Sequence, residues 1–161
     1  MDYRELVQYG YRYALSLTNN GHDAEDLVQE AFVKIKGKSK DVSKTYFYKT
    51  IKSLFIDKYR RESLVVFDTE QAEQDSQLQE TFDEEISVSA EHIEICLEVL
   101  RPVEREVLFL SAVEQYTAEE IGNMMEKPRG TILSLIHRSK IKFRDKLRSL
   151  EHKDKISRDI K

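Results

Sequence analysis

Cysteine, proline and glycine are scarce in this chain. Its 161 residues include one cysteine, two prolines and five glycines, and tryptophan is absent. A single cysteine excludes an internal disulfide, and the apolar neighbours of Cys96 indicate a small buried side chain rather than a redox or catalytic one. Few residues would break a helix, and runs of alternating β-branched residues, which would favour strands, are scarce. We therefore expect an all-α protein.

Long apolar runs are also missing. No stretch approaches the about 18 residues that a transmembrane helix needs, and the start Met-Asp-Tyr-Arg-Glu does not fit a signal peptide. We therefore expect a soluble, cytoplasmic protein with no membrane insertion.

Catalytic and metal-binding patterns are lacking as well. The sequence has no glycine-rich phosphate loop, nucleophile elbow or paired catalytic carboxylates. Four acids fall within residues 23–30, but an acidic helix face explains them more simply than a metal site. The histidines are scattered along the chain: His22, His92, His137 and His152. We expect no enzymatic activity, no cofactor and no metal.

Charge is segregated along the chain, although the net charge is only −4. Residues 62–98 hold 12 acids and no lysine or arginine, so the remainder carries 26 bases against 18 acids. Local basic patches predict nucleic-acid binding better than the overall isoelectric point does. The two ends of this chain therefore have the charge of nucleic-acid-binding surfaces.

Three helices are expected in a first domain, residues 1–64. Apolar residues recur with helical spacing in three segments: 3–18, 23–36 and 43–61. Asn19 begins an Asn-Asn-Gly sequence that suits a left-handed cap, and Asp23 is the expected N-cap of the second helix. The third helix could be interrupted near Lys52.

A second helical domain, residues 90–150, is expected after a flexible acidic linker at 65–89. The linker has few large apolar residues, so it cannot offset the entropy of ordering. The second domain is expected to contain four helices: about 90–100, 102–113, a short one after a Thr117–Glu120 capping box, and a last one from Pro128. The charged tail, 151–161, is expected to fray.

Residues 116–147 predict a helix-turn-helix, in which the second helix enters the DNA major groove. Seven bases against one acid lie between Arg129 and Arg148, and Gly130 allows close backbone approach to a phosphate. The alternative is a plain helical hairpin with a basic exterior.

A second basic segment, residues 34–61, holds ten lysines or arginines against two acids. Aromatic residues are interleaved with them: Tyr46, Phe47, Tyr48 and Tyr59. Cations attract phosphates and exposed rings stack on unpaired bases, at about 1–3 kcal/mol per base. Alternatively, the rings are core and the lysines form a solvated face.

Three segments resemble a bacterial RNA polymerase sigma factor of the extracytoplasmic-function (ECF) group. Residues 23–35 are similar to that family's helix for binding the polymerase core. Residues 46–61 resemble its promoter-melting and minus-ten segment, and 100–110 with 116–147 resemble its minus-thirty-five domain. The resemblance implies a factor that directs promoter-specific transcription initiation of a stress or envelope regulon. Its implied partners are core RNA polymerase, promoter DNA and an anti-sigma factor.

The resemblance also implies a set of contact residues for each partner. Core polymerase would bind Asp23, Glu25, Asp26, Gln29, Glu30, Val33 and Lys34. The minus-ten element would contact Tyr46, Tyr48, Lys49, Lys52, Ser53, Arg60 and Arg61. The minus-thirty-five element would contact Arg129, Gly130, Thr131, Ser134, His137, Arg138 and Lys140.

The sequence departs from the family pattern at several of these places. Leu133 and Leu135 stand where many members carry lysine or arginine, and leucine can touch a thymine methyl group but cannot donate a hydrogen bond. Glu126 occupies a turn position where glycine is frequent. Two rival functions remain at this stage: a helix-turn-helix regulator that acts without polymerase, and a helical adaptor that binds only protein.

Overall fold

The computed structural model describes residues 2–38, 42–62 and 89–160. These residues form α1 (Tyr3–Thr18), α2 (Gly21–Lys36), α3 (Lys44–Glu62), α4 (Ala90–Glu98), α5 (Pro102–Leu108), the π-helical turn η1 (Phe109–Val113), α6 (Ala118–Met125) and α7 (Arg129–Asp159). The expected all-α class and two helical domains are confirmed. The expected acidic linker falls almost entirely outside the described residues.

Helices α1 to α3 form the N-terminal domain, in which each helix packs on the other two. The third helix is continuous, so the expected interruption near Lys52 is wrong. Its buried residues are Phe47, Tyr48, Ile51, Leu54 and Phe55. Gly10 of α1 lets this helix approach closely, because an added Cβ would collide with the Phe47 ring. Close packing of α3 against α1 therefore depends on glycine, which has no side chain, at position 10.

The caps of α1 and α2 are formed by neighbouring asparagines. Asn19 ends α1 in the left-handed region, at φ 49° and ψ 29°, as expected for that residue type. Asn20 then starts α2, and its side-chain oxygen accepts from the backbone N–H of Asp23 at 3.1 Å. The expectation that Asp23 is the N-cap is wrong, because Asn20 reaches the free amide first and α2 begins at Gly21.

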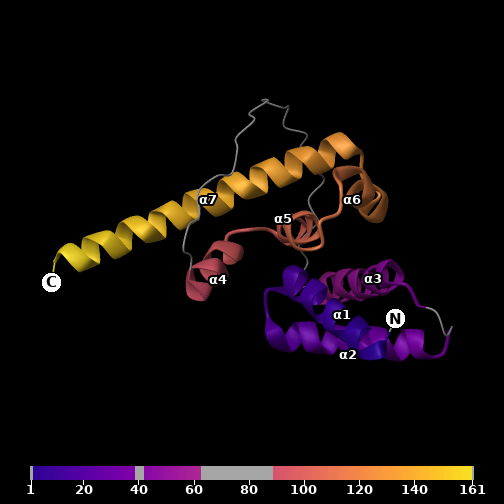
Figure 1. Cartoon of the computed structure of the whole chain (residues 1–161). Helices are drawn as coiled ribbons and strands as arrows, with labels where there is room; N and C mark the ends of the chain where they lie inside the picture. Colours follow the sequence, from indigo (N-terminus) through magenta and orange to yellow (C-terminus); the bar gives the residue numbers. More distant parts are fainter. Residues whose placement is uncertain (1, 39–41, 63–88, 161) are drawn as a thin grey trace.

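Helices α4 to α7 form the C-terminal domain (Figure 1), in which α7 packs against α4, α5 and α6. The expected Thr117–Glu120 capping box is present. The expectation that residues after 150 fray is wrong, because α7 continues to Asp159. Leu147 is buried, and Nε2 of His92 in α4 lies 3.1 Å from Oδ2 of Asp154. Contacts with α4 thus reach the last turns of α7.

The two domains are in direct contact, and α5 packs on α1 (Figure 1). Buried residues of α1 and α3 and those of α5 to α7 belong to one continuous apolar core. The lone cysteine, Cys96, is fully buried in α4, and burial raises the pKa of its thiol. No helix among the described residues is long and apolar enough to cross a membrane.

Candidate protein and nucleic-acid interfaces

The outward face of α2 carries the residues expected to bind a protein partner. Glu25, Asp26, Gln29, Glu30, Val33 and Lys34 are all exposed. Val33 is 73 % exposed, although it is an apolar side chain, and it lies between Glu30 and Lys34 on the same helix. The opposite side of α2 is buried through Ala24, Leu27, Val28, Ala31 and Ile35. An exposed apolar side chain with a polar rim suits a surface that a partner covers.

Asp23 lies apart from this set because it is partly buried and paired within the domain. Its Oδ1 accepts from Nζ of Lys58 in α3 at 3.3 Å. This pair is half-exposed, so it contributes little to stability. Asp23 therefore links α2 to α3, and its contact with a partner stays a prediction.

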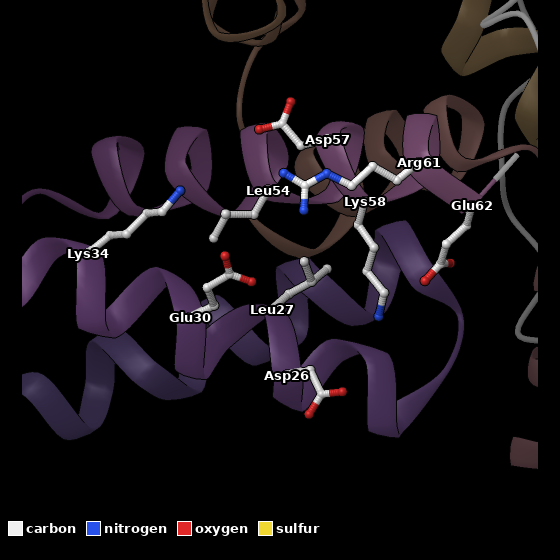
Figure 2. Close-up of a pocket in the computed structure, with 9 residues that line it drawn as sticks. All are labelled: Asp26, Leu27, Glu30, Lys34, Leu54, Asp57, Lys58, Arg61 and Glu62. Atoms are coloured by element: carbon white, nitrogen blue, oxygen red, sulfur yellow. The ribbon is translucent and has the colours of Figure 1, made fainter.

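A groove of about 400 Å³ separates α2 from α3 (Figure 2). Its lining mixes four acids, three bases and two leucines: Asp26, Glu30, Asp57, Glu62, Lys34, Lys58, Arg61, Leu27 and Leu54. Figure 2 places Arg61 on the α3 side of the groove and Asp26 and Glu30 on the α2 side. A polyanion would meet four carboxylates here, so the groove is better suited to a protein segment of mixed charge.

A second pocket, of about 280 Å³, lies beside α3, and none of the described residues that line it is acidic. It is lined by Lys34, Ile35, Lys38, Tyr46, Lys49, Thr50 and Ser53. The ring of Tyr46 is 44 % exposed here. The structure thus brings together Tyr46, Lys49 and Ser53, three residues expected to contact the minus-ten element. An exposed ring among lysines offers both base stacking and phosphate attraction.

Tyr48 and Lys52 face elsewhere, along a different stripe of α3. Tyr48 is 1 % exposed and its ring stacks on Tyr13, with ring centroids 4.3 Å apart. The expectation that Tyr48 contacts DNA does not fit this structure, because a buried ring has no free face. Lys52 is committed to an ion pair with Glu106 of the C-terminal domain, at 3.0 Å. The remaining two residues of the set, Arg60 and Arg61, are exposed at the end of α3.

The turn between α6 and α7 packs directly against the backbone of Gly122. An added Cβ at Gly122 would lie 2.7 Å from the carbonyl oxygen of Lys127. Glu126 ends α6 at φ 56° and ψ 44°, in the left-handed region that favours glycine. Behind the turn, Ile121 and Ile132 are fully buried. These contacts fix the angle at which α7 leaves α6, as a helix-turn-helix requires.

The first turns of α7 present the residues expected to contact duplex DNA. Arg129 and Gly130 are exposed, and five others are partly exposed: Thr131, Ser134, His137, Arg138 and Lys140. Thr131, Ser134 and Arg138 follow one another at helical spacing, so they share a face. Leu133 is 43 % exposed beside them, whereas Leu135 is 2 % exposed and belongs to the core. The accessible basic surface therefore lies at the start of α7.

Further along, α7 is anchored by a buried carboxylate that the sequence did not reveal. Glu104 of α5 is 1 % exposed and accepts from Lys142 Nζ at 2.7 Å and from the Arg101 backbone N–H at 2.8 Å. Burial alone would raise the pKa of Glu104, but these hydrogen bonds and the Lys142 charge outweigh it and lower the pKa. Lys142 therefore stabilises the fold.

Sequence reasoning also missed Arg105 and Glu106, which cross the domain boundary. Arg105 donates from Nε to the Ser16 carbonyl and from Nη2 to the Leu17 carbonyl, both at 2.9 Å. Glu106 accepts from the Tyr13 hydroxyl at 2.6 Å. The only signal was charge inside an apolar run, Val103 to Leu110, and that pattern does not say which groups neutralise the charge.

Across residues 2–38, 42–62 and 89–160, no three histidine, cysteine or carboxylate groups are arranged to hold a metal ion.

Comparison with known proteins assigns both domains. Family models match twice: Sigma-70 region 2 over residues 2–65 and Sigma-70, region 4 over residues 92–143. The ECF RNA polymerase sigma factor SigE of Mycolicibacterium smegmatis is 29% identical over 155 residues, which cover 89% of this chain and 59% of that protein. This chain thus spans less than two thirds of SigE. SigW of Bacillus subtilis, also an ECF sigma factor, is 26% identical over 156 residues, covering 87% and 83%.

A solved structure has the same fold. The sigma factor RpoE of Bartonella quintana, in complex with the anti-sigma factor NepR, matches with a TM-score of 0.64 and 20% identity, over 90% of this chain and 93% of that one. The two matched regions follow the two helical domains, and both curated relatives are ECF factors. The chain therefore belongs to the ECF group of the sigma-70 family, whose members are not enzymes.

Proposed function

We propose that this chain binds core RNA polymerase and gives it promoter specificity. The observation that carries the proposal is that acidic and basic residues lie on different parts of the surface. The outward face of α2 is acidic with one exposed valine, whereas the pocket beside α3 and the start of α7 are basic. Acidic and basic faces on one small chain suit a protein partner at the first and DNA at the other two.

The polymerase contact is assigned to Glu25, Asp26, Gln29, Glu30 and Val33. Their side chains are exposed, and in α2 they stand opposite the buried stripe, so a partner can reach them without unfolding the bundle. Asp23 and Lys34 border this face: the first is paired to Lys58 and the second lines both pockets beside α3. Lys34 is thus placed where protein and DNA surfaces meet.

The minus-ten contact is assigned to the pocket around Tyr46, Lys49 and Ser53. Its volume of about 280 Å³ and its lysine rim fit an unpaired base with flanking phosphates. The minus-thirty-five contact is assigned to the start of α7, where Arg129 and Arg138 supply charge and Leu133 supplies an apolar contact. Two weak DNA contacts become one avid contact when the polymerase links them.

The cellular location, the regulon and the inhibitor of the chain are proposed from the same family relationship. Core RNA polymerase works in the bacterial cytoplasm, and we place the chain there. The regulon is proposed to concern stress or the envelope, as the group's description implies. An anti-sigma factor is proposed as its inhibitor, since the similar solved structure is a complex with one.

The test is transcription by purified core polymerase on a promoter library, with and without this chain. We expect specific start sites that appear only when the chain is added. Tight binding to a palindromic site without polymerase, and no specific initiation with it, would overturn the proposal in favour of a conventional helix-turn-helix regulator.

A further inference from the structure

Leu133 is a large apolar side chain on the outside of α7, in the second turn of that helix. It is 43 % exposed, whereas Ile132 and Leu135 are 0 % and 2 % exposed and belong to the core. The proposed function places this part of α7 against duplex DNA, and the first residues of such a helix are the ones that reach base edges. Leu133 is therefore placed to meet a base rather than to pack within the domain.

The stripe of α7 that carries this leucine consists of residues three or four positions apart: Gly130, Leu133, His137 and Lys140. None of these four residues is buried, whereas the neighbouring stripe of Ile132, Leu135 and Ser139 is buried. Side chains on a helix lean toward its N-terminus, so Leu133 leans over the turn that contains Gly130. The leucine and the glycine thus share one patch of the outer surface.

Gly130 is a glycine that the fold itself does not require. Its φ is not positive, and an added Cβ would meet no atom within 4 Å. Glycine inside a helix destabilises that helix relative to alanine, so Gly130 weakens α7 without improving any contact within the chain. The space beside it is open to the outside, where the edge of a bound duplex can approach the helix closely.

The major-groove edges of the four bases differ in what they offer to a leucine. Guanine, adenine and cytosine present hydrogen-bond donors and acceptors there, and only thymine adds an apolar group, its C5 methyl. A leucine placed on a donor or acceptor would displace water from it without replacing the hydrogen bond. Against a methyl group it buries apolar surface on both partners. An exposed leucine in this position therefore favours thymine and disfavours the other bases.

We propose that Leu133 reads the methyl group of one thymine in the minus-thirty-five element, and that Gly130 leaves the space in which this methyl group meets the leucine. The assignment rests on the proposed function and names the base that this site prefers. Arg129 and Arg138 supply charge for phosphates, which positions the helix but does not choose a base. Leu133 is the specificity-determining residue among them.

The test removes the methyl group from the DNA. Each thymine of the minus-thirty-five element is replaced in turn by uracil, which pairs like thymine but lacks the methyl group, and binding of each promoter duplex by the holoenzyme is measured. Uracil at one position should weaken binding about fourfold, as expected for one buried methyl group. If no thymine shows this effect, the assignment of Leu133 is overturned.

Two variants connect the effect of uracil to the leucine. In Leu133→Ala the thymine and uracil duplexes should bind nearly equally, because the shortened side chain no longer reaches the methyl group. Leu133→Met keeps a long apolar side chain and should retain most of the preference for thymine. A Leu133→Ala variant that still distinguishes thymine from uracil as the original chain does would also overturn the assignment.

The matched control is Ile156→Ala, which shortens an apolar side chain that is 46 % exposed near the other end of α7. This control should distinguish uracil from thymine as well as the original chain does. Loss of the distinction in Ile156→Ala would contradict the assignment, because the cause would then lie away from the start of α7.

Gly130→Ala tests the second part of the proposal. The added methyl group meets open space within the fold, so the melting temperature should stay the same or rise. Promoter affinity should nevertheless fall about fourfold or more, because the added group keeps the thymine methyl away from Leu133. Unchanged affinity in this variant would overturn the role of Gly130.

Failure of the proposed function has a different result. If the chain and core polymerase give no specific initiation, that function fails, and duplexes selected from a random pool by the full-length chain alone replace the promoter in the uracil scan. The scan then still decides whether Leu133 reads a methyl group. If the chain selects no duplex at all, Leu133 has no base to read and its assignment is overturned as well.

Discussion

The hydroxyl of Tyr13 donates a 2.6 Å hydrogen bond to Oε1 of Glu106, across 93 positions of sequence. Both residues are 2 % exposed, and burial together with the Glu106 carboxylate raises the pKa of Tyr13 well above its ordinary value. The tyrosine therefore stays protonated and remains a donor. One residue of α1 thus satisfies a buried charge that α5 brings to the domain boundary.

Removing that hydroxyl tests how much the hydrogen bond contributes to the free energy of unfolding. In Tyr13→Phe the ring can still stack on Tyr48, but Glu106 loses a donor. We expect the free energy of unfolding to fall by about 1.5–3 kcal/mol, the range for a hydrogen bond to a charged group. Urea denaturation followed by circular dichroism measures it. Tyr3→Phe, at an exposed ring, is the control, and equal stability of the two variants would contradict the account.

The Glu104–Lys142 contact predicts a dependence of stability on acid pH. The pKa of Glu104 is lowered in the folded chain, so its contribution is present above the pKa of the unfolded chain and is lost as pH falls through the folded pKa. Glu104→Gln should cost about 1–3 kcal/mol at neutral pH and flatten the loss of stability below about pH 4.5. Denaturant titrations at several pH values measure this. An acid profile as steep as that of the exposed control Glu119→Gln would count against it.

The folded chain is expected to be less stable with Glu126 at this position than it would be with glycine. Glu126 holds φ 56° at the end of α6, where a side chain costs about 1 kcal/mol or more. Glu126→Gly should therefore raise the free energy of unfolding by about 0.5–1 kcal/mol, after the entropy that glycine costs in the unfolded chain. Thermal unfolding measures it, with the helix-interior variant Asn123→Gly expected to move the other way. A lower melting temperature for Glu126→Gly would show that the turn is not strained.

Arg138 at the start of α7 is expected to contact a phosphate of duplex DNA. Arg138→Ala should weaken promoter binding by the holoenzyme at all sequences and reduce the slope of log affinity against log salt by about 1. Fluorescence anisotropy over a salt series gives the slope. Arg148→Ala, an exposed arginine three turns further along, should leave the slope unchanged. Equal slopes for Arg138→Ala and the original chain would remove Arg138 from the interface.

Local pattern predicted much of the fold, because caps and apolar spacing are properties of neighbouring residues. The bounds of α1 and the Thr117–Glu120 capping box follow from such signals and are confirmed. The continuity of α3 was missed, although it contains neither glycine nor proline to interrupt it. The length of α7 was missed because it depends on α4, through Leu147 and Asp154.

The candidate sites were harder to predict, because helical spacing does not show which stripe meets another domain. Tyr46 and Tyr48 looked equivalent in the sequence, yet one ring is exposed and the other stacks on Tyr13. The charges of Arg105 and Glu106 could not be interpreted at all, since their partners lie about 90 positions away in the chain. Their roles are set by tertiary contact alone.

The central claim, that the outward face of α2 binds core polymerase, is tested most directly by titrating core enzyme into a fluorescently labelled chain. Asp26→Ala with Gln29→Ala should weaken binding about tenfold or more if these side chains lie at the centre of the interface. Lys36→Ala, exposed on the same helix, and Arg138→Ala should bind core enzyme like the original chain. If the double variant retains full affinity for core polymerase, or if the original chain does not bind it, the account is contradicted.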